Sequence, residues 1–202
     1  MKLRIAIIDY GVGNLRSVEK GLLHSGAEVI TTSNINSAMS SDGIILPGVG
    51  AFKDAMKRVR ALDEKLKDYI KEKPVLGICL GMQMYFTESE ENGLHKGLDL
   101  MRGRVVMFPR SVKIPQMGWN SIKIKKKTKL LEGIKDGDYF YFVHSYYAKP
   151  EEDVTTATSN YGLEFPAIVE KNNAYATQFH PEKSGNAGLK ILQNFVEIAK
   201  KK

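Results

Sequence analysis

The only cysteine of the chain, Cys79, follows a short apolar run, residues 74–78, and precedes a run of helical spacing, residues 80–86. A side chain at a strand-to-helix turn stands at the carboxyl edge of a sheet, where it can act as a nucleophile. The first N–H groups of a helix also favour a thiolate over a thiol. We therefore predict a nucleophilic thiol here, although a lone cysteine is more often a small core residue.

A catalytic thiolate needs a base, and the base needs a group that orients it. His180 and Glu182 follow a strand-like segment that ends at Phe179. This spacing predicts a triad of Cys79, His180 and Glu182. His180 would take the thiol proton and later protonate a leaving amine, while Glu182 would hold the ring and stabilise the imidazolium.

Acyl transfer also requires backbone donors for an oxyanion, each worth about 3–4 kcal/mol. The N–H of Leu80, at the start of the expected helix, is one candidate. The turn at residues 47–50 offers a second, the N–H of Val49.

The other histidines leave alternatives open. His144 competes for the role of base, but its position after a strand and its hydroxyl neighbours suit ligand contact or structural bonding equally well. His24 and His95 have no partner pattern, and His180 alone would fit a core histidine. One cysteine and four scattered histidines give no credible metal cluster, so no metal is expected.

The first half of the chain alternates strand and helix patterns, which predicts a parallel sheet covered by helices on both faces. We expect strands at residues 3–9, 27–31, 43–46 and 74–78, and helices at 15–25, 52–71 and 79–86. The turns at 10–14, 47–50 and Cys79 should then cluster at the carboxyl ends of the strands.

The second half contains short runs rich in β-branched and aromatic residues, separated by turns, so that some of these strands are expected to be antiparallel. The expected strands are 103–108, 121–124, 139–143, 154–159, 167–170 and 174–178, followed by a helix at 188–199. The sequence thus predicts one α/β domain spanning residues 1–202, with a central, mostly parallel sheet and added antiparallel strands.

Composition narrows the function classes. The net charge of +7 comes partly from the lysine-rich run 123–129, which we interpret as a solvated edge strand or loop rather than a nucleic-acid site. The amino terminus resembles a first strand, not a signal peptide, and no apolar run approaches the roughly 18 residues of a membrane span. A free thiol fits a reducing compartment, so a cytoplasmic location without membrane contact is expected.

Two blocks, residues 77–83 and 178–184, resemble the class I, triad-type glutamine amidotransferases in residues, order and spacing. More narrowly, four segments are similar to the glutaminase subunits of imidazole glycerol phosphate synthases: residues 9–15, 46–52, 115–120 and 142–146. The resemblance covers essentially the whole chain.

This resemblance implies hydrolysis of L-glutamine to glutamate and ammonia through a γ-glutamyl thioester on Cys79, without a cofactor. It also implies a heterodimer with a separate (β/α)₈-barrel cyclase subunit. That subunit would use the ammonia to make imidazole glycerol phosphate and aminoimidazole carboxamide ribotide in histidine biosynthesis.

The resemblance also assigns roles to individual positions. Residues matching glutamine-binding positions are Gly48, Gln83 for the amide, Glu91 for the amino group, and the backbone of Ser145 and Tyr146 for the carboxylate. Residues matching the cyclase interface are Asn14, Trp119, Tyr141 and Lys183, although Trp119 and Tyr141 would also fit as core aromatics.

Val49 occupies a position that is often glycine in related amidotransferases. We hypothesise that its amide points away from the oxyanion in the isolated chain and turns inward when the loaded cyclase is bound. Three other functions stay open: the amidotransferase component of an anthranilate- or aminobenzoate-type synthase, a Cys–His hydrolase, and a non-catalytic interaction module.

Overall fold

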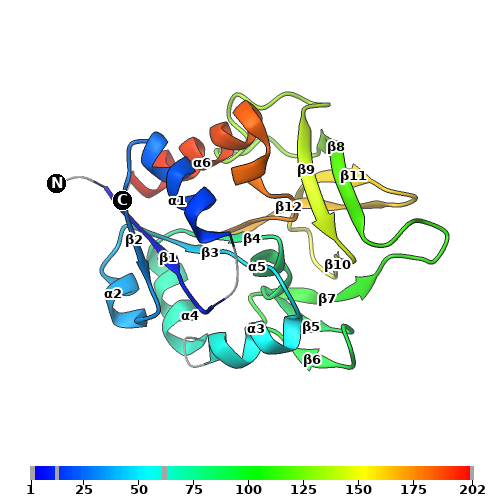
Figure 1. Ribbon diagram of the computed structural model, residues 1–202, viewed down its shortest axis with the longest axis horizontal. Helices are drawn as coiled ribbons and strands as arrows, with labels where there is room; N and C mark the ends of the chain where they lie inside the picture. The colour runs from blue at the N-terminus through cyan, green and yellow to red at the C-terminus, as the bar shows by residue number, and fades with distance from the viewer. Residues whose placement is uncertain (1–2, 12–13, 61–62, 201–202) are drawn as a thin grey trace.

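A nine-stranded mixed sheet forms the centre of the molecule in the computed structural model, which describes residues 3–11, 14–60 and 63–200 (Figure 1). In spatial order its strands are β2 (Glu28–Thr32), β1 (Arg4–Ile8), β3 (Gly43–Leu46), β4 (Val75–Ile78), β13 (Ala174–Thr177), β12 (Glu164–Lys171), β11 (Thr155–Asn160), β8 (Gln116–Ile124) and β9 (Tyr139–His144). The first five pair in parallel and the others antiparallel.

The parallel half of the sheet is buried on both faces, because its strands are apolar at successive positions. In β1, Ile5 and Ile7 face one core while Ala6 and Ile8 face the other. The first core is covered by α1 (Leu15–His24) and α6 (Gly185–Lys200). The second is covered by α2 (Ile35–Met39), α3 (Phe52–Val59), α4 (Asp63–Glu72) and α5 (Leu80–Gln83). The predicted α/β fold with helices on both faces is confirmed.

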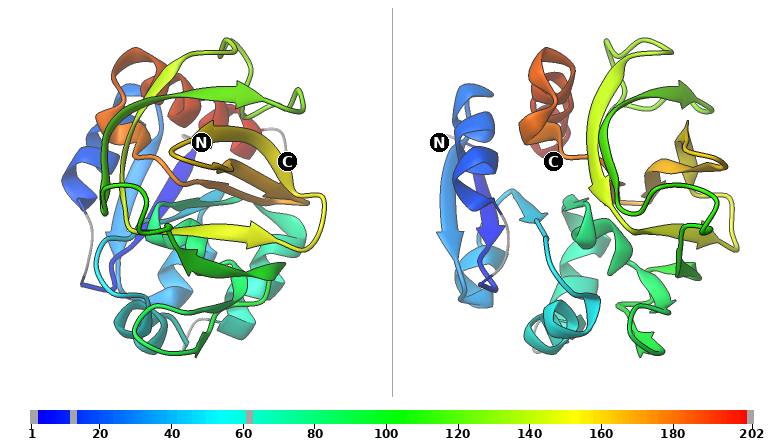
Figure 2. Two further views of the ribbon diagram at one scale, coloured as in Figure 1. Left: turned by 90° about the vertical axis from the view of Figure 1, so that its right-hand side faces the viewer. Right: turned by 45° about the vertical axis from the view of Figure 1, so that its right-hand side comes forward.

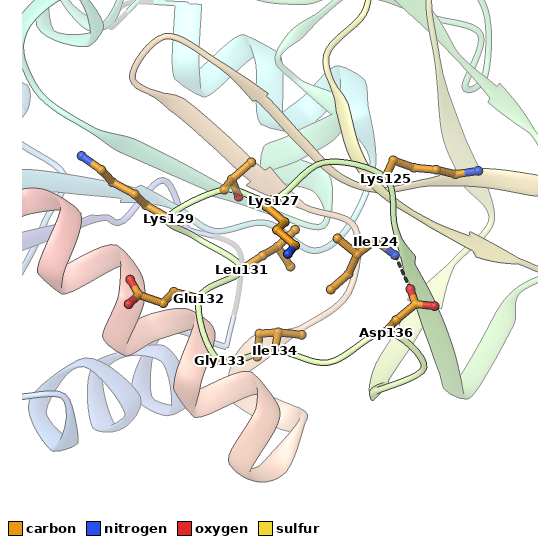
Figure 3. A pocket seen from close by; sticks show the side chains of 10 residues that line it. Ile124, Lys125, Lys127, Lys129, Leu131, Glu132, Gly133, Ile134 and Asp136 are labelled. Atoms are coloured by element: carbon orange, nitrogen blue, oxygen red, sulfur yellow. Dashed lines mark hydrogen bonds between the residues drawn. The ribbon is translucent and has the colours of Figure 1, made fainter.

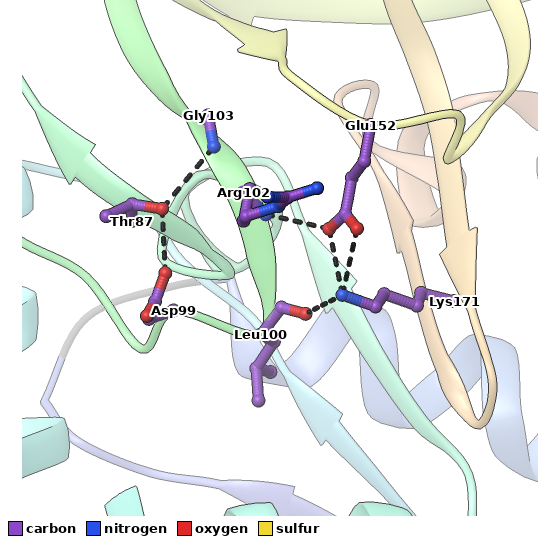
Figure 4. A network of polar contacts seen from close by, with 7 residues as sticks. All are labelled: Thr87, Asp99, Leu100, Arg102, Gly103, Glu152 and Lys171. Atoms are coloured by element: carbon purple, nitrogen blue, oxygen red, sulfur yellow. Dashed lines mark hydrogen bonds and ion pairs between the residues drawn. The ribbon is translucent and has the colours of Figure 1, made fainter.

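A smaller four-stranded sheet lies beside the antiparallel half (Figure 2). Its order is β10 (Tyr146–Pro150), β7 (Met101–Met107), β5 (Phe86–Ser89) and β6 (His95–Lys96). A polar network joins it to β12 (Figure 4). Lys171 Nζ donates to the carbonyl of Leu100 at 3.1 Å and to the Glu152 carboxylate at 2.9 Å, and that carboxylate accepts the N–H of Arg102.

The expected helices 52–71 and 79–86 were wrong in their extents. The first is divided into α3, which ends at Val59, and α4, which begins at Asp63. The second ends at Gln83, because the chain then enters the small sheet, where Tyr85 and Phe86 carbonyls accept hydrogen bonds from residues 99–101. The sequence interpretation also missed α2, β5, β6 and β10.

At one end of the parallel strands, the turns after β1, β3 and β4 meet as predicted. The hydroxyl of Tyr10 donates to the carbonyl of Pro47, and a Cβ at Gly48 would lie 2.7 Å from that hydroxyl and from the Leu80 Cβ. Residues 12–13 of the first turn lie outside the described residues. Among the described helices, none has the length and apolar character needed to cross a membrane.

Candidate active site

Cys79 lies in the turn between β4 and α5, with φ 55° and ψ −105°, in a backbone region that residues with a side chain rarely adopt. The turn is tight, because a Cβ at Gly81 would overlap the carbonyl oxygen of Leu46 and a Cβ at Gly77 would come within 2.8 Å of Gly81. The backbone N–H of Cys79 donates to the carbonyl of Thr177 at 2.7 Å, which joins the turn to β13. The observed geometry is that of a nucleophile elbow.

His180 follows the end of β13, and Glu182 lies in the 3₁₀ helix η2 (Pro181–Lys183). The Nδ1 of His180 is 2.9 Å from the Oε1 of Glu182, and both side chains are only 2% exposed. Burial alone would lower the pKa of His180. Interactions with the Cys79 sulfur and then with the Glu182 carboxylate outweigh burial and raise this pKa to about 10. His180 therefore carries a proton at neutral pH.

The second ring nitrogen of His180, Nε2, is buried and makes no hydrogen bond within the described part of the chain. Catalytic hydrogen bonds are often long before the substrate binds and shorten in the complex. Interaction with the Cys79 sulfur is the largest of the contributions that raise the pKa of His180. The structure thus brings the three residues of the predicted triad to one edge of the sheet.

His144, the alternative base, is the last residue of β9, and its ring bonds to a backbone carbonyl rather than to a carboxylate. Its Nδ1 lies 2.7 Å from the carbonyl oxygen of Tyr146, so Nδ1 must carry the hydrogen, and its ring is surrounded by Phe108, Phe142 and Phe165. Burial, followed by repulsion from His180, lowers the pKa of His144 to about 4 despite the hydrogen bond to Tyr146. This neutral, anchored ring suits structural bonding.

A cavity of about 270 Å³ opens beside the sulfur. It collects the predicted site residues Val49, Leu80, Gln83, Glu91, Ser145 and Tyr146, together with Cys79, Gly50, Pro115, Val143 and His144. Gly48 is not among the lining residues, but its missing side chain lets the 47–50 turn approach Leu80. A volume of this size suits a small amino acid better than a peptide.

Two polar side chains of the cavity are fixed by backbone groups. The Glu91 carboxylate accepts the N–H of Phe52, the first residue of α3, at 2.8 Å. Gln83 Nε2 donates to the Tyr146 carbonyl at 2.9 Å and to Gln178 Oε1 at 3.3 Å. Contacts within the chain therefore hold both side chains in place.

Gln178, Val143 and Pro115 also lie at this site, although they were not predicted from the sequence. Gln178 is fully buried, and its Nε2 lies 3.7 Å from the Cys79 sulfur, while the Val143 carbonyl lies 3.8 Å from the same atom. Gln178 begins the segment 178–184 and immediately precedes Phe179 and His180. This position was the only sequence signal that it could belong to the site. Val143 contributes its backbone carbonyl and Pro115 lines the cavity, and neither residue type indicates such a role in the sequence.

The four expected interface residues lie toward the outside. Trp119 on β8 is 53% exposed, which rules out the plain core role, and its ring meets the half-buried Tyr141 edge-on at 6.1 Å. Lys183 Nζ lies 5.8 Å from the centre of the Tyr141 ring. Asn14, at the start of α1, is exposed.

A larger hollow of about 860 Å³ lies away from this site, inside the loop between β8 and β9 (Figure 3). Its lining residues include the apolar Ile124, Leu131 and Ile134 and three lysines of the run 123–129. Lys125 pairs with Glu164 at 3.1 Å, and Lys126 next to it with Asp153 at 2.7 Å. Part of the lysine run that follows β8 is therefore engaged in ion pairs with acidic side chains.

Within the described ranges, no group of three or more histidine, cysteine or acidic side chains is placed to hold a metal ion. The polar groups among the lining residues of the cavity include the thiol of Cys79, the imidazole of His144, the carboxylate of Glu91 and the amide of Gln83.

The fold and this site define an α/β protein with a thiol at a strand-to-helix turn beside a buried histidine–carboxylate pair. The glutamine amidotransferase class-I profile matches residues 6–199, and the chain belongs to that family. It is 54% identical to "Imidazole glycerol phosphate synthase subunit HisH" of Methanosarcina mazei, over 96% of this chain and 98% of the relative. For the protein of the same name from Archaeoglobus fulgidus the identity is 48%, over 98% of this chain and all of the relative.

Solved structures share the architecture at much lower identity. A putative GMP synthase protein from Thermoplasma acidophilum superposes with a TM-score of 0.76 at 19% identity, over 99% of this chain and 95% of its own. The PurLQS structure from Thermotoga maritima gives 0.73 at 20% identity, over 98% and 99%. These likenesses support the fold.

Proposed function

We propose that this chain is the glutaminase subunit of an imidazole glycerol phosphate synthase in histidine biosynthesis. The observation that carries the proposal is the Cys79 elbow next to the buried His180–Glu182 pair, in a chain about half identical to relatives of that name over nearly its whole length. The glutamine amidotransferase domain would span residues 1–202, in a cytoplasmic enzyme without a metal or cofactor.

The Cys79 sulfur attacks the side-chain amide carbon of glutamine, which forms a carbon–sulfur bond and places negative charge on the amide oxygen. His180, protonated at neutral pH, gives its proton to the departing nitrogen, and the carbon–nitrogen bond breaks to release ammonia. A water molecule, deprotonated by His180, then attacks the thioester. Glutamate leaves and the thiol is restored, while Glu182 keeps the ring oriented throughout.

The cavity supplies complementary groups for the substrate. The carboxylate of Glu91 suits the α-ammonium group, and backbone donors at Ser145 and Tyr146 suit the α-carboxylate. The amide of Gln83, whose oxygen is its remaining acceptor, suits the amide end. The N–H groups of Leu80 and Val49 are the proposed oxyanion donors, with Gly48 allowing the 47–50 turn its close approach.

The proposed partner is a separate (β/α)₈-barrel cyclase subunit that receives the ammonia. The proposed contact surface consists of Trp119, Tyr141, Lys183 and Asn14. An exposed tryptophan such as Trp119, which packs on Tyr141 beside the Lys183 cation, is typical of an interface anchor. We further propose that the Val49 amide turns toward the oxyanion only when the loaded cyclase is bound.

The test is glutamate release by the purified chain, alone and with its cyclase and the cyclase substrate. We expect hydrolysis that depends on Cys79 and increases in the loaded complex. A chain that hydrolyses other amides but not glutamine would contradict the proposal, and high turnover without the partner would contradict the proposed Val49 rearrangement.

A further inference from the structure

A buried series of hydrogen bonds connects the substrate cavity with the sulfur of Cys79. The carbonyl oxygen of Tyr146 accepts from His144 Nδ1 at 2.7 Å and from Gln83 Nε2 at 2.9 Å. Gln83 Nε2 also donates to Gln178 Oε1 at 3.3 Å, and Gln178 Nε2 lies 3.7 Å from the sulfur. The series therefore extends from the cavity wall to the reacting atom.

The backbone carbonyl of Tyr146 fixes the orientation of the side-chain amides of Gln83 and Gln178. A carbonyl oxygen can only accept, so the nitrogen of Gln83 must face Tyr146. The same nitrogen donates to Gln178, which must present its oxygen there. The nitrogen of Gln178 is consequently directed at the sulfur of Cys79, as a donor.

A hydrogen-bond donor beside the Cys79 sulfur would stabilise the anionic form of that sulfur. The carbonyl oxygen of Val143 lies 3.8 Å from the sulfur, and this acceptor suits the neutral S–H but repels a sulfur anion. A buried anion is stable only where donors or positive charges face it. Gln178 Nε2 is such a donor, and its side chain is fully buried.

We propose that Gln178 stabilises the anionic sulfur of Cys79 by donating a hydrogen bond to it, and that Gln83 holds Gln178 in the required orientation. The inference rests on the proposed function in one respect, that the sulfur is the nucleophile. It adds a residue between the glutamine-binding groups and the triad.

Several titratable groups surround the sulfur and must be kept constant in a test. Tyr10, after β1, and His180, after β13, interact with it electrostatically. Glu182 bonds to His180, and His144 of β9 interacts with His180. A substitution confined to the Gln178 amide leaves all four groups in the protein.

The test is alkylation of the full chain by iodoacetamide over a series of pH values. Cys79 is the only cysteine, so the labelled mass reports this sulfur alone. Gln178→Met keeps the length of the side chain and removes the N–H donor. We expect the midpoint of alkylation to rise by about one pH unit or more, which makes labelling at neutral pH about tenfold slower.

Gln178→Glu should raise the midpoint further, because a carboxylate beside the sulfur repels the anion. Gln116→Met is the matched control, since this buried amide on β8 makes no hydrogen bond within the described residues. Its midpoint should equal that of the wild type. Thermal unfolding checks each variant, and if Gln178→Met does not fold, the isosteric Gln178→Glu decides the question.

Wild-type midpoints in the folded Gln178 variants would overturn the inference. A raised midpoint in a chain whose wild type does not hydrolyse glutamine would leave the role of Gln178 standing and would contradict the proposed function instead. The two failures are therefore distinguishable.

Discussion

Two regions of the molecule use their side chains in opposite ways. Around Cys79, a histidine, a carboxylate and two amides are buried and pair with one another. On the outer face of β8 and β9, the large side chains of Met117, Trp119 and Tyr139 are more than half exposed. Contacts within this chain therefore arrange the buried groups around Cys79, whereas large exposed side chains gathered on one face are typical of a protein-binding surface.

Strand β9 belongs to both regions, because its side chains alternate between them. Phe140, Phe142 and His144 point into the core, whereas Tyr141 lies toward the exposed face. The carbonyl of Tyr141 accepts the backbone N–H of His180 at 2.9 Å. A partner bound to the outer face would thus touch a strand that is bonded directly to the backbone of His180.

The largest effect is expected for Cys79→Ala, which should abolish one activity of the complex and leave another unchanged. Cys79→Ala should reduce glutamine-dependent synthesis by the complex on the order of 10⁴-fold, because no other group replaces the nucleophile. Synthesis from free ammonia should be unchanged, since the outer face is intact. Loss of both activities would show that the regions cannot be separated in this way.

Glu182→Gln sharpens the account of the buried region. It removes a charge that helps to raise the pKa of His180 to about 10, so we expect kcat/KM to fall about 10²–10⁴-fold. The pKa of His180 is above its ordinary value of 6.5, so the stability contributed by the protonated ring is complete below pH 6.5 and is lost as the pH rises toward 10.

The stability lost in Glu182→Gln should therefore be largest below about pH 6.5 and should shrink as the pH rises toward 10. Chemical denaturation at several pH values measures this dependence. A loss that is the same at every pH would contradict the charge interaction between Glu182 and His180.

Trp119→Ala tests the exposed region. The affinity for the cyclase should fall about 10- to 100-fold, as for a central aromatic residue of an interface, while the unfolding temperature of the isolated chain changes little. Leu23→Ala, at an exposed residue near the end of α1, is the control and should keep the wild-type affinity. Equal affinity in both variants would place the partner elsewhere.

The smallest effect is expected for His144→Phe, which should change how the folding stability depends on pH. The pKa of His144 is lowered from its ordinary value of 6.5 to about 4, so the unfolded chain takes up a proton between these values that the folded chain does not. Acid therefore destabilises the wild type there, by at most about 1.4 kcal/mol per pH unit for this group. The variant should lose that slope, whereas Phe140→Leu should lower stability equally at every pH.

Much of this molecule was predictable from local patterns. The apolar runs indicated the parallel strands, and the residue types near 79 and 180–182 predicted that Cys79, His180 and Glu182 lie at one edge of the sheet, because each pattern lies within a few residues. Gln178 and the strands β5 and β6 were missed, since their roles depend on contacts between distant segments, such as Gln83 with Tyr146. Trp119 was ambiguous, because an aromatic residue in a strand has the same local pattern in a core as on an interface.

The most direct test is the mass of the chain after incubation with glutamine and rapid quenching in acid, followed by digestion. We predict one added glutamyl group on the peptide that contains Cys79, and none in Cys79→Ala. If the enzyme hydrolyses glutamine but forms no such adduct, or forms it on another residue, Cys79 is not the nucleophile.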